Sequence, residues 1–514
     1  MAGDEVDPIT LEVVRNALIG TAEEAGAALR RTAYSPNIKE RVDCSTAVFD
    51  ADGRMVAQAE HIPVHLGSMP MSVAAAREAF DELAPGDQVL VSDAFAGGTH
   101  LPDWTLVAPV HDEEGHLLGF AANRAHHSDV GGAAPGSMPA GATEIFAEGL
   151  RIPPVKLAVA GEESRDLVAL LLANTRTPRE RLGDLRAQVG ANYLTATRLR
   201  TLATELGVDG LAAAMAATLD HAERALAAAV EDLPDGTYRF EDVLDDDGTG
   251  VEDIPIRVVL TIDGPDVTCD LRGSARQVPG SVNAPLAVTV SAAVYALRAV
   301  AAPDLPANDG LTRSLTVLTE QGSIVDALPP AAVAAGNVET SQRIVDVLLG
   351  AFAQAAPDRV GAASQGTMNN TLLGGVDPRS GRGGAGSDRG GEPFTYYETL
   401  AGGTGAGPWG AGADGTHSHM TNTKNTPIEA FELAYPVRVV EYRLRDGSGG
   451  TGEHAGGRGL RRVLEVLGDE ATASLLTERR THAPWGAAGG GGGATGRIHS
   501  FPTRRSSDDR KSVV

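Results

Sequence analysis

The sequence predicts an α+β, multidomain protein with mixed sheets, an intervening helical block and long, ordered, glycine-rich loops. Three observations support this prediction. First, the chain has 514 residues, which is more than one hydrophobic core usually supports. Second, stretches with apolar residues at helical spacing alternate with short, β-type segments bounded by turns. Third, glycine dominates from about residue 361 onward, yet Trp, His and Asn are interleaved with it, which is unusual for a flexible linker.

The N-terminal region is expected to be an α+β domain over residues 1–150 that holds a candidate metal site. Its first element is predicted to be one helix over residues 9–34, which Pro36 ends. Short segments rich in Val, Leu and Phe follow, and turns at Asp52-Gly53 and Glu114-Gly115 separate them. This pattern is typical of a sheet that carries loops.

Two further regions are expected beyond it. Residues 151–234 are predicted to be a helical block, in which Gly207 ends one segment and Asp209 caps an alanine-rich run. Residues 235–496 are predicted to be a C-terminal α+β domain with glycine-rich site loops, beginning with a hairpin around Gly264-Pro265. No repeat with a period of about 20–50 residues is visible, which disfavours solenoids and propellers.

Residues 497–514 differ in character from the rest of the chain. They contain five Lys or Arg and two Asp, a net charge of 5 − 2 = +3, whereas the whole chain carries −25. The string "SFPTRRSSD" resembles translated sequencing-adapter read-through. We therefore expect residues 497–514 to be a non-native tail and the true C-terminus to be missing.

Composition excludes several classes of partner. A net charge of −25 has the wrong sign for a protein that wraps a phosphate backbone, so no nucleic acid partner is expected. No segment approaches the roughly 20 apolar residues of a membrane span. The acidic N-terminus lacks the features of a secretory signal, and we therefore expect a cytoplasmic protein. Cys44 and Cys269 are expected to be free thiols.

Three polar clusters in the first 130 residues combine imidazole and carboxylate side chains. This combination is the ligand set of catalytic divalent metals such as Zn, Mn or Fe. The clusters are "NIKERVDCS" with Glu40 and Asp43, "GGTHLPDW" with His100 and Asp103, and "RAHHSDVGG" with His126, His127 and Asp129.

Structural explanations compete with this hypothesis. An isolated H-x-x-D pair is more often a turn whose two side chains bond each other. In an extended segment adjacent side chains point to opposite faces, so His126 and His127 cannot both face one centre. Glu60, His61 and His65 could supply further ligands or acid/base groups, although a surface loop explains them equally well.

The sequence gives no support for other common sites. It lacks the G-x-x-x-x-G-K-[ST] phosphate loop, and its glycine-rich stretches lack the strand and helix that a dinucleotide fingerprint requires. It also lacks the G-x-S-x-G elbow of serine hydrolases.

Six motifs between residues 7 and 490 point to one known family. They are, in order, "SPNIKERVDCSTAVFDADGRMVAQAEHIPVHLGSM", "GGTHLPDWTLVAPV", "HHSDVGGAAPGSMP", "GSVNAPLAVTVSAAVYALR", "GNVETSQRIVDVLLGAFAQAAPDRVGAASQGTMNN" and "GTHSHMTNTKNTPIEAFE". Together they resemble the hydantoinase B/oxoprolinase family. This family includes N-methylhydantoinase B subunits, the C-terminal half of 5-oxoprolinase, and related subunits of acetone and acetophenone carboxylases.

The resemblance implies an ATP-dependent partnership. A hydantoinase A-like, ATP-binding subunit phosphorylates the substrate carbonyl or enol, and the B-like subunit acts on the activated intermediate. In the carboxylase relatives the corresponding subunit carries a metal. The matching positions here are Glu40, His100, Asp103 and His126. The run "VSDAF" departs from the Asn-Asp-Pro-Tyr type of run that the family commonly has.

We therefore expect this chain to be the B-type subunit of an ATP-dependent hydantoinase or 5-oxoprolinase. The enzyme is expected to be a hetero-oligomer that hydrolyses a cyclic amide. Its expected cofactor is a divalent metal (Mn, Zn or Fe), and ATP is used by the partner. A carboxylase subunit and a non-catalytic scaffold for the A-type subunit are the alternatives. Hydrogen-bond donors in the motifs "GNVETSQR", "QGTMNN" and "HMTN" are expected to stabilise the negative charge that develops on the substrate oxygen. The alternative is that the Asn and Gly residues of these motifs only form turns. The expected catalytic residues are His127, Asp129, Asn337, Asn369 and His419.

Overall fold

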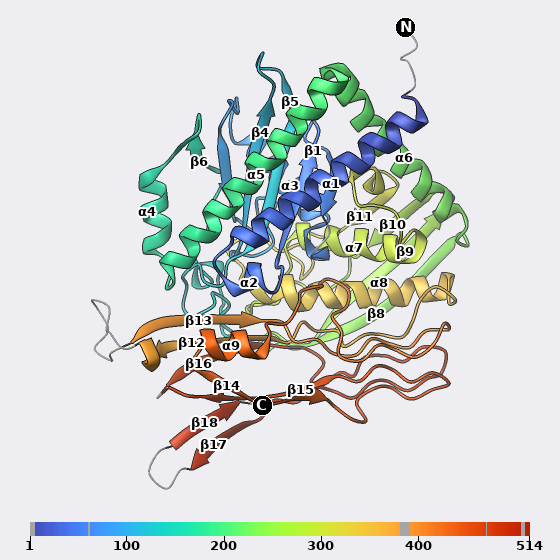
Figure 1. Cartoon of the computed structure of the whole chain (residues 1–514). Helices are drawn as coiled ribbons and strands as arrows, with labels where there is room; N and C mark the ends of the chain where they lie inside the picture. Colours follow the sequence, from blue (N-terminus) through green and yellow to red (C-terminus); the bar gives the residue numbers. More distant parts are fainter. Residues whose placement is uncertain (1–5, 60–61, 381–390, 469, 505–508, 514) are drawn as a thin grey trace.

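The computed structural model describes residues 6–513 except 60–61, 381–390, 469 and 505–508. Helices and four separate sheets build the described part of the chain (Figure 1), which confirms the predicted multidomain α+β fold. Of the candidate residues named from the sequence, Glu60 and His61 lie outside the described residues.

A seven-stranded sheet forms the N-terminal part, with strand order β2-β1-β5-β4-β3-β6-β7 and antiparallel neighbours. Residues alternate between its two faces. Val48 and Ala121 pack toward the long helices, and Ala47 and Ala122 pack toward α3. The strands are β1 (Cys44–Phe49), β2 (Met55–Ala59), β3 (Gln88–Val91), β4 (Asp103–His111), β5 (Leu117–His126), β6 (Val155–Val159) and β7 (Glu162–Glu163), and α3 is Ser68–Glu78.

Two long helices, α1 and α5, run across one face of this sheet (Figure 1). Helix α1 (Pro8–Thr32) agrees with the helix expected over residues 9–34. The side chain of Asp7 caps it by accepting a hydrogen bond from the backbone N–H of Thr10 at 3.0 Å, and Pro8 occupies its first turn. Its apolar stripe then packs on β1 and β2.

The helical block consists of α4 (Arg165–Ala173), α5 (Pro178–Leu206) and α6 (Val208–Glu231). It starts later than residue 151, because β6 and β7 extend the N-terminal sheet before it. Gly207, at φ +75°, joins α5 to α6, which are bent by 109° relative to each other. No single helix of the described chain is long and apolar enough to cross a membrane, and only the bent pair α5–α6 meets that criterion jointly, by length and composition.

A second sheet begins at Gly236 with strand order β11-β10-β9-β8. The predicted hairpin around Gly264-Pro265 joins β9 to β10, where Asp263 pairs with Asp266. Helices α7 and α8 pack on this sheet in the largest hydrophobic cluster, which also takes in residues from the N-terminal part. The elements are β8 (Gly236–Asp246), β9 (Glu252–Asp263), β10 (Asp266–Asp270), α7 (Leu286–Ala301), β11 (Leu315–Leu318) and α8 (Ser341–Ala355).

The glycine-rich region forms a further layer beyond α8 (Figure 1). Its loops hydrogen-bond one another, as when Thr404 N donates to Ala413 O at 3.0 Å. A Cβ on Gly405 would lie 1.8 Å from the carbonyl oxygen of Ala362, so glycine allows the backbones to pack this closely. The elements are β12 (Asn370–Asp377), β13 (Glu392–Glu398), α9 (Ile428–Ala434), β14 (Val437–Leu444), β15 (Leu460–Val466) and β16 (Ala471–Leu476).

The C-terminal segment also has regular structure. Strands β17 (Ser500–Arg504) and β18 (Asp509–Val513) form a hairpin, and β18 joins β15 through the pairs Leu464–Val513 and Glu465–Ser512. That residues 497–514 are a non-native tail stays a prediction.

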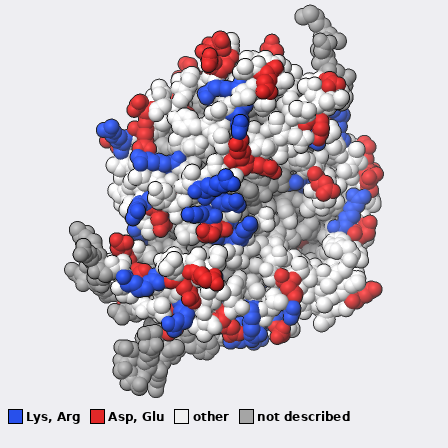
Figure 2. Space-filling view, in the orientation of Figure 1, with Lys and Arg blue, Asp and Glu red and all other residues white. Residues whose placement is uncertain are grey.

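Acidic and basic side chains are interspersed over the face shown in Figure 2. This mixture on one face accompanies the overall net charge of −25.

Candidate metal centre

Two glycines shape the loop that carries His100. Gly97 has φ +79°, and a Cβ there would lie 2.3 Å from the carbonyl carbon of Met71. A Cβ on Gly98 would lie 2.5 Å from the carbonyl oxygen of Asp93. Because no side chain fits at either position, the sequence "GGTH" lets the loop press against neighbouring backbone and turns His100 into the interior.

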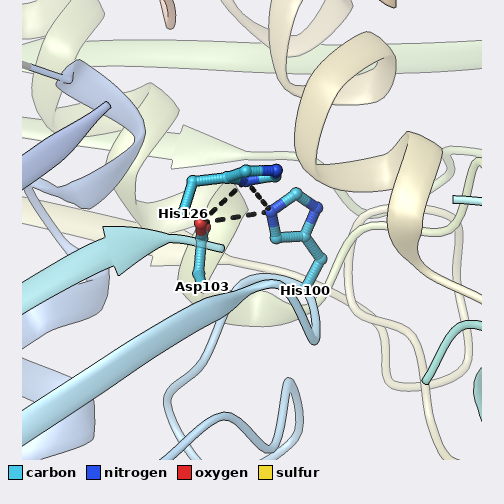
Figure 3. Close-up of side chains that lie close together, drawn as sticks. All are labelled: His100, Asp103 and His126. Carbon is cyan, nitrogen blue, oxygen red and sulfur yellow. Dashed lines mark hydrogen bonds and ion pairs between the residues drawn. The ribbon is translucent and has the colours of Figure 1, made fainter. Parts of the chain in front are cut away.

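Strand register brings the other two residues together. Asp103, the first residue of β4, pairs directly with His126, the last residue of β5. Paired residues on adjacent strands project from the same face of a sheet, so both side chains point toward His100 (Figure 3). All three side chains are almost completely buried.

The three donor atoms form a nearly equilateral triangle (Figure 3). His100 Nε2 and His126 Nδ1 are 3.1 Å apart, and each lies 3.2 Å from Asp103 Oδ1. Metal–ligand bonds of about 2.1 Å separate neighbouring ligand atoms by about 3.0 Å in octahedral and about 3.4 Å in tetrahedral geometry. The triangle therefore fits a divalent cation, and neutral imidazole with carboxylate is a suitable donor set for one.

Hydrogen bonds hold the carboxylate in place. Asp103 Oδ2 accepts from Thr99 Oγ1 at 2.5 Å and lies 3.7 Å from His65 Nε2, while His65 Nδ1 bonds Ser45 Oγ at 2.8 Å. Burial opposes ionisation of Asp103. Even so, its electrostatic interaction with His100 and hydrogen bonds from the surrounding imidazoles hold its pKa well below the usual range. Asp103 is therefore an anionic donor.

Burial has the opposite effect on the histidines. It lowers the pKa of His126 and of His65, although Asp103 favours the charged form of both. Neutral imidazole is the form that binds metals.

A small cavity of about 20 Å³ lies beside the triangle, which is room for one ion or water. Asp43 lines it together with Asp103, His126 and Asn337. The preceding residue, Val42, has φ +60°, which is strained for a β-branched side chain and is the kind of outlier found at functional sites.

Neither Glu40 nor Asp43 belongs to the group of three converging donors around His100. Glu40 caps the short helix α2 (Pro36–Lys39) and is only half-buried. The cavity-lining carboxylate of the "NIKERVDCS" motif is Asp43, three residues later.

The structure does not bring His127 and Asp129 to the triangle. The ring of His127 packs on Trp104, with centroids 4.2 Å apart, and its Nε2 bonds Gln188 Oε1 at 2.9 Å. Asp129 accepts hydrogen bonds from the backbone of Gly136 and from Arg176, at 3.1 and 2.9 Å. Both residues have the contacts of structural side chains.

The three remaining candidate catalytic residues, Asn337, Asn369 and His419, do not all lie at the small cavity. Asn337 lies in a π-helical turn, Gly336–Thr340, where it lines the small cavity and its Oδ1 has no hydrogen-bond partner in the described structure. Asn369 accepts from Arg480 Nη2 at 2.6 Å. His419 Nε2 lies 3.3 Å from Asp346 Oδ1. Neither Asn369 nor His419 lines the small cavity.

Other residues of this site carried little or no signal in the sequence. His65 was one of two histidines in a motif that a surface loop explained equally well. Tyr397, whose ring stacks on His126 with centroids 4.3 Å apart, comes from a strand more than 270 residues away. Only the folded chain shows that Asp43, rather than Glu40, lies at the cavity.

Comparison with known proteins places this geometry in context. A sequence profile described as Hydantoinase B/oxoprolinase matches residues 7–513. An uncharacterised protein of Methanocaldococcus jannaschii is 40% identical over 96% of this chain and 84% of its own length. 5-Oxoprolinase 1 of Arabidopsis thaliana is 36% identical over 96% of this chain, which spans 39% of that relative. A Pseudomonas protein named as the B-type subunit of a putative D-/L-hydantoinase is 31% identical over 96% of this chain and 84% of its own length.

Two solved structures share the fold. The ATP-dependent caprolactamase of Pseudomonas jessenii superposes with a TM-score of 0.85 at 29% identity, covering 99% of this chain and 90% of that one. A nucleotide-free acetone carboxylase superposes with a TM-score of 0.88 at 20% identity, covering 97% of this chain and 67% of that one.

Proposed function

Because this chain belongs to the hydantoinase B/oxoprolinase family, we propose that it is the B-type subunit of an ATP-dependent hydrolase of cyclic amides, with hydantoin or 5-oxoproline as substrate. Relatives named as a 5-oxoprolinase and as the B-type component of a hydantoinase support this proposal, as does the structural similarity to a caprolactamase. The observation that carries it is the buried triangle of His100, Asp103 and His126 beside an ion-sized cavity.

An A-type, ATP-binding partner subunit completes the proposed enzyme. The Arabidopsis relative extends well beyond the part that this chain spans, and this chain lacks a phosphate-loop motif. We therefore assign phosphorylation of the substrate to the partner and ring opening to this chain.

The proposed cofactor is a divalent metal, Mn, Zn or Fe, held by His100, Asp103 and His126, with Asp43 in place of Glu40 as the fourth side chain. A cation bound there would act as a Lewis acid toward a carbonyl or phosphoryl oxygen of the substrate. Asp43 supplies negative charge at the cavity, and the adjacent strain at Val42 favours a functional role.

The reaction needs activation because amide nitrogen is a poor leaving group and resonance stabilises the carbonyl. Phosphorylation of the carbonyl oxygen removes that resonance. Water then adds to the same carbon, the C–N bond breaks as nitrogen takes a proton, and a second water releases phosphate from the acyl phosphate that remains.

The chain's own side chains would orient the reactants. Asn337, with its amide at the cavity, is placed to donate a hydrogen bond to the oxyanion that develops when water adds. His65 lines the same cavity, and its ring lies between Ser45, which bonds Nδ1, and Asp103, which faces Nε2, so His65 is placed to hold the Asp103 carboxylate in position.

The proposal is tested by purifying the chain alone and together with an A-type subunit from the same genome. We expect ATP-dependent ring opening only from the mixture, and no ATP binding by the chain alone. Calorimetry showing micromolar ATP binding by the isolated chain would contradict this division of labour. If the Asn337→Ala and His65→Ala variants, each mixed with the A-type subunit, keep full turnover, that result would instead favour the non-catalytic scaffold alternative.

A further inference from the structure

A second, much larger cavity of about 900 Å³ lies within the glycine-rich layer. It adjoins the small cavity through one extended segment. Met368 lines the small cavity, whereas its neighbours Thr367 and Asn369 line the large one. The two cavities therefore share a wall, but none of the proposed metal ligands lines the large one.

The lining of the large cavity is strongly basic. Seven arginines and only two carboxylates, Asp446 and Glu453, contribute to it, although the whole chain carries 68 acidic against 43 basic residues. This local reversal of charge favours an anionic ligand.

Three of these arginines, Arg445, Arg480 and Arg497, lack a carboxylate partner among the described residues, and Arg497 belongs to the segment expected to be a non-native tail. Arg445 Nη1 donates to the carbonyl of Thr495 at 2.8 Å, and Arg480 Nη2 donates to Asn369 Oδ1 at 2.6 Å. By contrast, Arg479 beside them pairs with two carboxylates. Arg445 and Arg480 thus place two positive charges in the cavity wall that the described fold leaves without ion pairs.

The acidic groups near Arg480 neutralise its charge only in part. Burial raises the pKa of Glu339 to about 8 and of Glu478 to about 7, so near pH 7 both carry less negative charge than an ordinary glutamate. Asp245 is occupied by the backbone N–H groups of residues 480–482.

We infer that this cavity binds a phosphate group, either as free phosphate or as part of a small phosphate ester, with Arg445 and Arg480 as its charged contacts. A phosphate offers three or four acceptor oxygens, which suits two guanidinium groups better than the two oxygens of a carboxylate. The volume also admits a ligand larger than the phosphate itself. This inference does not depend on the proposed metal centre.

The test is calorimetric titration of the full-length chain with inorganic phosphate, glycerol phosphate and acetate. We expect saturable binding of at least one phosphate probe and much weaker binding of acetate. Arg445→Ala and Arg480→Ala should each raise the Kd about tenfold or more. The control Arg198→Ala removes an exposed arginine that pairs with Glu24, and it should leave the Kd unchanged.

Two further measurements keep the outcome clear. Titration of His100→Ala excludes the metal centre as the phosphate site, and we expect its Kd to match that of the wild type. Melting curves show whether each arginine variant is folded, and Arg480→Lys, which keeps the charge, should bind better than Arg480→Ala. Absence of saturable phosphate binding, acetate binding equal to phosphate binding, or an unchanged Kd in both arginine variants would overturn the inference.

Discussion

His100 Nε2 and His126 Nδ1 face each other at 3.1 Å across a single oxygen of Asp103. If both nitrogens carried protons toward Asp103, two N–H groups would crowd each other in a buried site. If one of the two nitrogens carried no proton, that nitrogen and the oxygen of Asp103 would be two hydrogen-bond acceptors in contact with no donor between them. A cation bound by all three atoms would satisfy them at once.

Asp43 and Glu40 provide a matched pair of tests within one motif. Asp43→Asn should weaken metal binding about tenfold or more, because Asp43 lines the cavity. Glu40→Gln should leave metal binding unchanged, because Glu40 caps α2 outside the donor group. Competition with a chelator, read by elemental analysis, measures both affinities. The reverse ranking would restore Glu40 as the ligand.

His127 should behave as a structural residue. His127→Ala removes the stacking on Trp104 and the hydrogen bond to Gln188, and it should lower the free energy of unfolding by about 2 kcal/mol. Metal content should be unchanged. Urea denaturation with metal analysis of the same sample checks both expectations. Normal stability with lost metal would place His127 at the centre instead.

Glu148 should make stability depend on pH. Burial raises its pKa from an ordinary 4.5 to about 8, although hydrogen bonds from the backbone N–H groups of Ala334 and Val333 act to lower it. A carboxyl with a raised pKa contributes stability that is complete below about pH 4.5 and is lost as the pH rises through 8. Glu148→Gln can still accept both bonds but does not titrate.

We therefore expect Glu148→Gln to match the wild type near pH 5 and to exceed its stability by more than about 1 kcal/mol near pH 8. Urea denaturation at the two pH values provides the measurement. An equal difference between variant and wild type at both pH values would mean that Glu148 is ionised throughout.

Local signals in the sequence predicted several elements well. The helical spacing of apolar residues over 9–34 predicted α1, and the turn residues Gly264-Pro265 predicted the hairpin between β9 and β10. The alternation of side chains along a strand also correctly predicted that only one of His126 and His127 can face the centre.

Other features depend on contacts between distant parts of the chain. The N-terminal sheet extends past residue 150 because β6 pairs with β3, some 65 residues earlier. Asp129 is expected from the sequence to be catalytic, but Arg176, 47 residues away, occupies its carboxylate. The choice between Glu40 and Asp43 depends on which of them the turn before β1 directs into the cavity.

The most direct test of the metal centre is the metal content of the purified wild type beside His100→Ala. We expect about one divalent metal per wild-type chain and almost none in the variant, because His100 supplies one of three converging donors. Melting curves should show that both proteins fold. Equal metal content in a folded His100→Ala would contradict the proposed centre.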